Sequence, residues 1–233
     1  MKRFSEVFRD SRSSVLAAMA RALLALEDVV EELEEVRGIE VDSASLDVEY
    51  LERTGAPIRI LVAAPGREGV LDEGEGYVIE ATPYAEDNVW RLYEELATFF
   101  ASYAYRRLGR YLPSPEGTEY FLAVMDSGEV FLAQGFRDRV SLPIVDGMVL
   151  TAHTHPNNVY WFSRPDLRTA LEFFSRRGFA TAVVTQVRTA LLYRVGPFTL
   201  EDYEALLKAS RTRDAEEAYR LLEEAPNLRV VLV

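Results

Sequence analysis

The chain contains only two histidines, His153 and His155, which stand two positions apart at the end of an apolar run. In an extended strand, residues i and i+2 project from the same face, so both imidazoles are expected to point at one spot, about 6 to 7 Å apart along the backbone. Asp166 follows a short distance downstream. Two imidazoles and one carboxylate can hold a tetrahedral zinc ion with its fourth position left for water, which is typical of catalytic zinc sites. The residue types therefore indicate a zinc site, and because the chain has no cysteine, a thiolate site is excluded.

Each of these residues also has a purely structural interpretation. A His-x-His pair on a strand is weak evidence for a metal by itself. The segment from Ser163 to Asp166 is typical of a helix start, with Ser163 as N-cap, Pro165 in the first turn and Asp166 at the third position. The two interpretations are compatible, because a carboxylate at the start of a helix has a fixed direction and can serve the cap and a metal together.

In this segment the chain resembles the JAMM metalloproteases, the zinc-bearing branch of the MPN-domain proteins, with prokaryotic JAB-like members. Their signature is an upstream Glu, then His-x-His-Pro, seven residues counted from that Pro, and Ser-x-x-Asp. Here His153-Thr-His155-Pro156, the stretch 156–162 and Ser163-Arg-Pro-Asp166 match every fixed position after the Glu. The resemblance covers about residues 116–196. It implies an α+β fold with a three-layer α/β/α, cytidine-deaminase-like core.

The resemblance also implies a role for each site residue. His153, His155 and Asp166 would bind Zn²⁺, an upstream Glu would deprotonate the attacking water, and Ser163 would help to stabilise the oxyanion. Zinc lowers the pKa of a bound water to about 7, and a nearby carboxylate can pass the proton to the leaving amine. By the same resemblance, the protein is a zinc-dependent metallopeptidase or isopeptidase. Its substrate would be an amide or isopeptide bond at the C-terminal tail of a ubiquitin-like or sulfur-carrier protein.

Three glutamates are candidates for the general base. We predict Glu119, because it opens the apolar strand expected at 120–125 and the family's Glu also begins such a strand. Glu116 lies in a loop rich in proline, and Glu129 follows the turn signature Asp126-Ser-Gly128; both stay open as alternatives. The separation of 34 residues between Glu119 and His153 is shorter than is usual in the family. It implies that a segment before the metal strand has been trimmed.

The charge and composition of the chain disfavour two classes of partner, nucleic acids and membranes. The formal net charge of −12 disfavours nucleic-acid binding, which depends on clustered Lys and Arg. This counts against a RadC-like function, although RadC-like proteins share His-x-His-Pro. No segment resembles a membrane span or a signal peptide, and the chain lacks cysteine, so we expect a cytoplasmic protein without a membrane partner.

Residues 1–115 are predicted to form an N-terminal accessory domain of helix, strands and helix, whose role the sequence does not indicate. A helix is expected at 12–37, strands near 39–51, 57–64 and 75–82, and a second helix at 86–112. The first helix carries a heptad seam that either packs inside the protomer or forms a homodimer surface: Leu16, Met19, Leu23, Leu26, Val30 and Leu33.

Residues 116–233 are predicted to form the metallopeptidase domain, with a C-terminal helical extension from about 199. Strands are expected at 118–125, 129–134, 138–142, 148–154, 179–185, 189–195 and 228–233, and helices at 164–177, 199–210 and 213–224. The three consecutive aromatic residues Tyr160, Trp161 and Phe162 either line a groove for an extended peptide, or Trp161 and Phe162 anchor their loop to the core. Asn157 and Asn158 are interpreted as turn residues.

Two other functions remain open at this stage. The chain could be an MPN-fold scaffold that keeps the site without catalysis, or a zinc hydrolase acting on a small amide or a nucleic-acid partner. The intact ligand set favours catalysis, because scaffold members commonly lack it.

Overall fold

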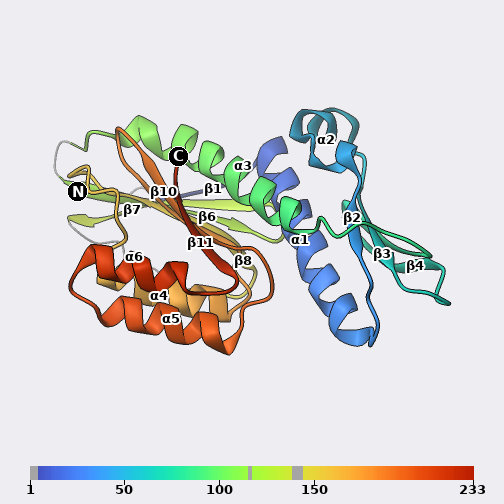
Figure 1. Cartoon of the computed structure of the whole chain (residues 1–233). Coiled ribbons are helices and arrows are strands. Elements are labelled where there is room, and N and C mark those ends of the chain that lie inside the picture. Colours follow the sequence, from blue (N-terminus) through green and yellow to red (C-terminus); the bar gives the residue numbers. More distant parts are fainter. Residues whose placement is uncertain (1–4, 115–116, 138–143) are drawn as a thin grey trace. The chain divides into compact units, whose positions relative to one another are not determined.

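The computed structural model describes residues 5–114, 117–137 and 144–233. Over these residues the protein has an α+β fold with six α-helices, a seven-stranded mixed sheet and a four-stranded mixed sheet (Figure 1). None of the described helices is both long enough and apolar enough to cross a membrane. The strand expected at 138–142 lies outside the described residues.

Backbone contacts divide the chain into two compact units. Unit 2 comprises Arg9–Leu96 and the turn Asp126–Gly128, and unit 1 comprises the rest of the described chain. Unit 1 therefore includes residues 5–8 and the part of helix α3 (Trp90–Leu108) that begins at Ala97. The domain boundary expected near residue 115 remains a prediction.

Unit 2 contains helix α1 (Ser11–Glu32) and a sheet of order β2-β3-β5-β4. Asp10 starts α1 through a capping box with Ser13. The strands are β2 (Ile39–Val41), β3 (Ile58–Ala63), β4 (Gly69–Gly74) and β5 (Tyr77–Thr82), and β3 and β5 run parallel. The first four residues of the predicted seam, Leu16, Met19, Leu23 and Leu26, are buried within the chain itself.

The strand predicted at 39–51 is wrong beyond Val41. A 3-10 turn (Ser43–Leu46) and helix α2 (Val48–Thr54) follow instead. Asp42 accepts a hydrogen bond from the N–H of Ala44, and Asp47 accepts one from the N–H of Tyr50, so both aspartates start helical turns. Gly55 then ends α2 in the left-handed conformation, with φ of 63°.

Unit 1 is built on the seven-stranded sheet, in the order β1-β7-β6-β8-β9-β10-β11. Its strands are β1 (Ser5–Arg9), β6 (Thr118–Met125), β7 (Glu129–Arg137), β8 (Met148–Thr154), β9 (Ala180–Val184), β10 (Thr189–Arg194) and β11 (Leu228–Leu232). The strands predicted from residue 118 onward are confirmed wherever the structure describes them, whereas β1 was not predicted. Strands β8 and β9 pair in parallel, and helix α4 (Arg164–Ser175) connects them.

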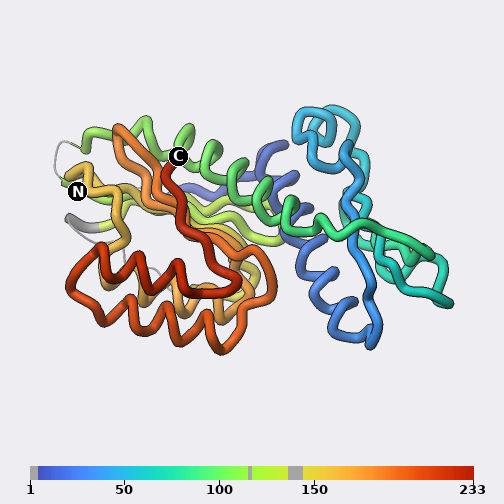
Figure 2. Tube along the Cα trace, in the orientation of Figure 1, coloured from blue at the N-terminus to red at the C-terminus, as the bar shows by residue number. Residues whose placement is uncertain are grey.

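Helices α4, α5 (Leu200–Arg211) and α6 (Ala215–Glu223) lie on one face of this sheet, and the unit 1 part of α3 lies on the other (Figure 1). In Figure 2 the chain runs from α5 through α6 and returns as β11 beside β10. The core between the sheet and α4 to α6 is apolar and includes Phe121, Val183, Leu192, Phe173 and Leu206. This packing fixes the start of α4 near the end of β8.

Candidate metal centre

Strand β8 delivers both histidines to one end of the sheet. His153 is the Cα partner of Phe121 on β6 and of Val183 on β9, so three strands fix its position. The N–H of His155 donates to the carbonyl of Val184 at 3.0 Å, which continues the β8–β9 pairing by one residue. The site therefore lies at the carboxyl ends of two parallel strands, where ligand sites of α/β units are commonly found.

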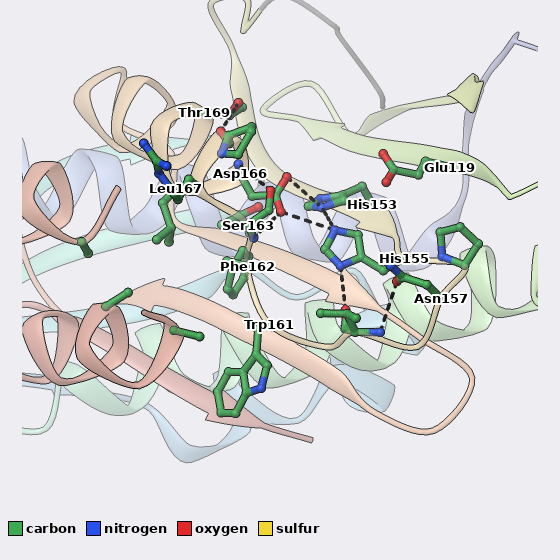
Figure 3. A pocket seen from close by; sticks show the side chains of 18 of the residues that line it. Glu119, His153, His155, Asn157, Trp161, Phe162, Ser163, Asp166, Leu167 and Thr169 are labelled. Atoms are coloured by element: carbon green, nitrogen blue, oxygen red, sulfur yellow. Dashed lines mark hydrogen bonds and ion pairs between the residues drawn. The ribbon is translucent and has the colours of Figure 1, made fainter. Parts of the chain in front are cut away.

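The two imidazoles and the carboxylate of Asp166 converge (Figure 3). The Nε2 atoms of His153 and His155 are 3.1 Å apart. Nε2 of His153 is 3.2 Å from Oδ1 of Asp166, and Nε2 of His155 is 3.3 Å from Oδ2. In a tetrahedral site with metal–ligand distances of about 2.0 to 2.1 Å, neighbouring ligand atoms lie roughly 3.3 Å apart. The donor set and its spacing thus fit a small tetrahedral cation.

A main-chain carbonyl selects the tautomer of His155. Nδ1 of His155 lies 2.6 Å from the carbonyl oxygen of Val159. Because a carbonyl can only accept, Nδ1 carries a proton, and Nε2 is the nitrogen that faces Asp166. Metal-binding histidines usually have such a second contact, which fixes the orientation of the ring.

Asp166 is held by the start of helix α4. Its Oδ2 accepts the N–H of Ser163 at 2.6 Å, and its own N–H donates to Oγ of Ser163 at 3.3 Å. This capping box confirms Ser163 as N-cap and Asp166 as the third helical residue. The same two residues therefore start the helix and aim a carboxylate at the histidines.

The electrostatics of the cluster favour a positive charge between its members. Burial disfavours the charged form of His153, but the carboxylates of Asp166 and Glu119 outweigh burial and raise the pKa of His153. Burial would also raise the pKa of Asp166, but the facing His153 and the hydrogen bonds to its carboxylate hold this pKa well below its usual range. A lone pair and an ionised carboxylate this close need a cation, either a proton or a metal ion, between them.

Glu119 lies on β6 and faces the same cavity as the histidines. It precedes Phe121 by two residues, so the two side chains share a face of the strand. In Figure 3 its carboxylate points toward His153, and both residues line one cavity. Glu129 follows the turn at the other end of β6, roughly 20 Å away at the usual rise per residue. Glu116 lies outside the described residues.

The cluster opens into a cavity of about 1020 Å³, all of whose lining residues belong to unit 1. Trp161 lines this cavity and packs its ring against Tyr219 of α6, with ring centroids 4.1 Å apart. Phe162 also lines it and is buried in the core. Both aromatic residues therefore anchor their loop and form the cavity wall. Asn157 and Asn158 belong to a turn, as predicted, and Asn157 accepts the N–H of Val159.

The sequence interpretation missed several contributors to this site. The carbonyl of Val159 carries no sequence signal, since any residue supplies one. Thr212, Arg213 and Asp214, in the connection from α5 to α6, line the cavity because the helices bring them there. Thr151 and Thr181 were also missed, although a threonine inside an otherwise apolar strand is a visible signal.

Comparisons with protein-family models, with curated proteins and with solved structures find no match to this chain.

Proposed function

We propose that the protein is a zinc-dependent metallopeptidase or isopeptidase that resembles the JAMM enzymes. The observation that carries the proposal is the convergence of Nε2 of His153, Nε2 of His155 and the carboxylate of Asp166 at 3.1 to 3.3 Å. The proposal includes the finer fold assignment, an α/β/α catalytic core like that of MPN-domain proteins and cytidine deaminases. Helices on both faces of the seven-stranded sheet support that assignment.

The donor set favours zinc over other common cations. Nitrogen ligands suit zinc, whereas calcium and magnesium prefer oxygen ligands and higher coordination numbers. With three protein ligands, a fourth position stays open toward the cavity. A zinc ion bound there would supply Lewis-acid chemistry, activating water and polarising a carbonyl.

Glu119 is the proposed general base. Its place on β6 puts its carboxylate beside the cluster without making it part of the ligand triangle. It would take a proton from the attacking water and deliver that proton to the leaving amine. General acid–base catalysis of this kind typically contributes a factor of about 100 to 10,000 in rate.

Ser163 is the proposed oxyanion donor. Its Oγ accepts the N–H of Asp166, which leaves the hydroxyl proton available to donate into the cavity. Its backbone N–H is already bound to the carboxylate of Asp166. The side chain can therefore serve the helix and the developing oxyanion together.

The substrate we propose is the C-terminal tail of a ubiquitin-like or sulfur-carrier protein. The cavity is large enough for several residues of an extended chain, and Trp161 and Phe162 give it an aromatic wall. Its rim contains the exposed Arg164 and Arg213, whereas the whole chain is strongly acidic. We also retain the earlier expectations of a cytoplasmic location and of no nucleic-acid partner.

The test is cleavage of a panel of fusions in which ubiquitin-like or sulfur-carrier proteins precede a reporter. Zinc-loaded protein should cleave at least one fusion after the tail, and protein stripped by a chelator should regain this activity when zinc is added back. If the protein binds one zinc per chain but cleaves no fusion and no small amide, the MPN scaffold becomes the better account.

A further inference from the structure

The sheet face that carries His153 is mostly apolar, and its polar positions include a pair of neighbouring threonines beside the metal cluster. Phe121, Ala123, Val183 and Leu192 belong to the core on this face. Thr151 lies two residues before His153 on β8, and its Cα partner on β9 is Thr181. Both threonines line the cavity, and they are only 4% and 8% exposed. Two nearly buried hydroxyls therefore lie side by side next to the metal cluster.

These hydroxyls have no hydrogen-bond partner among the described residues. Two of the other buried threonines have side-chain partners, since Oγ1 of Thr154 accepts the N–H of Tyr120 at 2.9 Å and Oγ1 of Thr185 donates to the carbonyl of Arg188 at 2.8 Å. Thr118 and Thr189 resemble Thr151 and Thr181 in showing no such bond among the described residues, but neither lines the cavity. Because both Thr151 and Thr181 line the cavity, their hydroxyls can bind water there, and a polar ligand group can take the place of that water. Thr151 and Thr181 thus offer two neighbouring hydrogen-bonding groups to a ligand in the cavity.

The chemistry of the pair selects a neutral ligand. Each hydroxyl can donate and accept, and neighbouring strands lie about 4.8 Å apart. An amide, which offers one N–H and one C=O, complements such a pair. A carboxylate is disfavoured because Asp166 lies nearby and the arginines that line the cavity, Arg164 and Arg213, are exposed. An apolar group would leave both hydroxyls unpaired.

We propose that Thr151 and Thr181 form a subsite for a neutral amide group of the substrate, and that they determine specificity there. The subsite lies two residues along β8 from His153, which corresponds to about 6 to 7 Å. An extended substrate spans this distance in two residues, so the amide is either a main-chain group two residues from the scissile bond or a carboxamide side chain near it. The link to cleavage rests on the proposed function; the binding of an amide does not.

The variants are Thr151→Val, Thr181→Val and the double variant, with Thr185→Val as the matched control. The double variant should keep its zinc content and melt at or above the parent temperature, because no protein hydrogen bond is lost. Thr185→Val should melt several degrees lower, because hydrogen bonds to Thr185 are lost. A clear fall in melting temperature for the double variant would mean that the hydroxyls stabilise the fold, and would overturn the proposal.

Binding is measured without catalysis, with N-methylacetamide as the probe and the methyl NMR signals of Val183 as the reporter. The probe should shift these signals in metal-free and zinc-loaded parent protein, and methyl acetate, which lacks the N–H, should shift them less. The double variant should bind N-methylacetamide several-fold more weakly. Equal binding by parent and double variant, or no binding by either, would contradict an amide subsite.

Cleavage then identifies the source of the amide. With a fusion that the parent cleaves, each Thr→Val change should raise KM about 2- to 10-fold with kcat nearly unchanged. Replacing the main-chain amide two residues from the scissile bond by an ester tests the main-chain source, and replacing a nearby Asn or Gln by Ala tests the side-chain source. If no fusion is cleaved, the proposed function fails while the probe titration still decides the subsite. An unchanged KM for the double variant, with both substrate changes also neutral, would overturn the proposal.

Discussion

The two sheets of this protein use their buried positions differently. In the four-stranded sheet every buried strand residue is apolar, with Ile58, Ile60, Val62 and Ile79 fully buried. In the seven-stranded sheet the buried strand residues include the threonines Thr118, Thr151, Thr154 and Thr181, and one more, Thr189. Four of these five lie on β6, β8 and β9, the strands around His153.

This difference indicates that the four-stranded sheet serves packing, whereas the seven-stranded sheet also carries the groups of the candidate metal centre. A sheet that only has to pack gains nothing from buried polar groups, because each one needs a partner to offset its lost hydration. Apart from Thr189 and Arg194 on β10, the buried polar residues of the seven-stranded sheet lie on the strands around His153. The comparison therefore predicts that changes near His153 affect metal binding and turnover, whereas changes in the four-stranded sheet affect stability.

The largest expected effect is on turnover. Glu119→Gln should retain zinc, because Glu119 is outside the ligand triangle, and should lose activity by a factor of about 100 to 10,000. Glu129→Gln is the matched control and should stay close to the parent, since it lies at the far end of β6. Steady-state cleavage of the best fusion measures both. Near-parental turnover by Glu119→Gln would remove this residue as the general base.

Substitutions at Ser163 can separate its role as helix cap from its proposed role as oxyanion donor. Ser163→Asn should keep a capping side chain and melt close to the parent, yet turn over about 100- to 1,000-fold more slowly, because an oxyanion donor is lost. Ser163→Ala should show the same loss of turnover and also cost about 0.5 to 2 kcal/mol of stability. A folded, zinc-loaded Ser163→Asn protein with parental turnover would leave Ser163 as a helix cap only.

In the four-stranded sheet we expect a substitution to lower stability without affecting zinc binding. Ile60 is fully buried on β3, so Ile60→Ala should cost about 2 to 5 kcal/mol of unfolding free energy. Its folded fraction should still bind one zinc per chain. Denaturant titration and elemental analysis measure the two properties. If the folded variant loses zinc, the separation between the packing sheet and the chemical sheet does not hold.

Zinc binding itself should stabilise the protein locally. At a free zinc concentration of 100 times Kd, binding adds about 2.7 kcal/mol to the stability of the state that binds it. Amide hydrogen exchange should therefore slow at 153–166 and 180–184 and stay unchanged at 58–63 and 77–82. Equal slowing in both sheets would argue for a general effect of the metal, and no slowing at 153–166 would argue against the site.

Local sequence patterns predicted the strands and the helix that carry the candidate metal centre in unit 1. The alternation and apolar runs of β6 and β8, and the capping signature at Ser163 and Asp166, are local features that the structure preserves. In the N-terminal half, the segment after Val41 was predicted as part of a strand at 39–51. Asp42 and Asp47 cap helical turns there, so the segment is helical instead. Strand β4 was not predicted because its acidic residues interrupt the alternation of apolar and polar residues that identifies a strand.

Other features depend on contacts between distant segments, which no local pattern contains. The carbonyl of Val159 sets the tautomer of His155, and the pairing of Thr151 with Thr181 needs the β8–β9 register. The spacing of the motif could predict that His153, His155 and Asp166 meet. It could not predict which nitrogen of each ring faces the carboxylate.

The most direct test of the metal centre is the zinc content of the parent and of His155→Ala. After equilibration with zinc and removal of excess metal, the parent should contain about one zinc per chain by elemental analysis. His155→Ala should contain almost none, because the chain has no cysteine and His153 is its only other histidine. A folded His155→Ala protein that keeps one zinc per chain would contradict the account, because the metal would then be bound elsewhere.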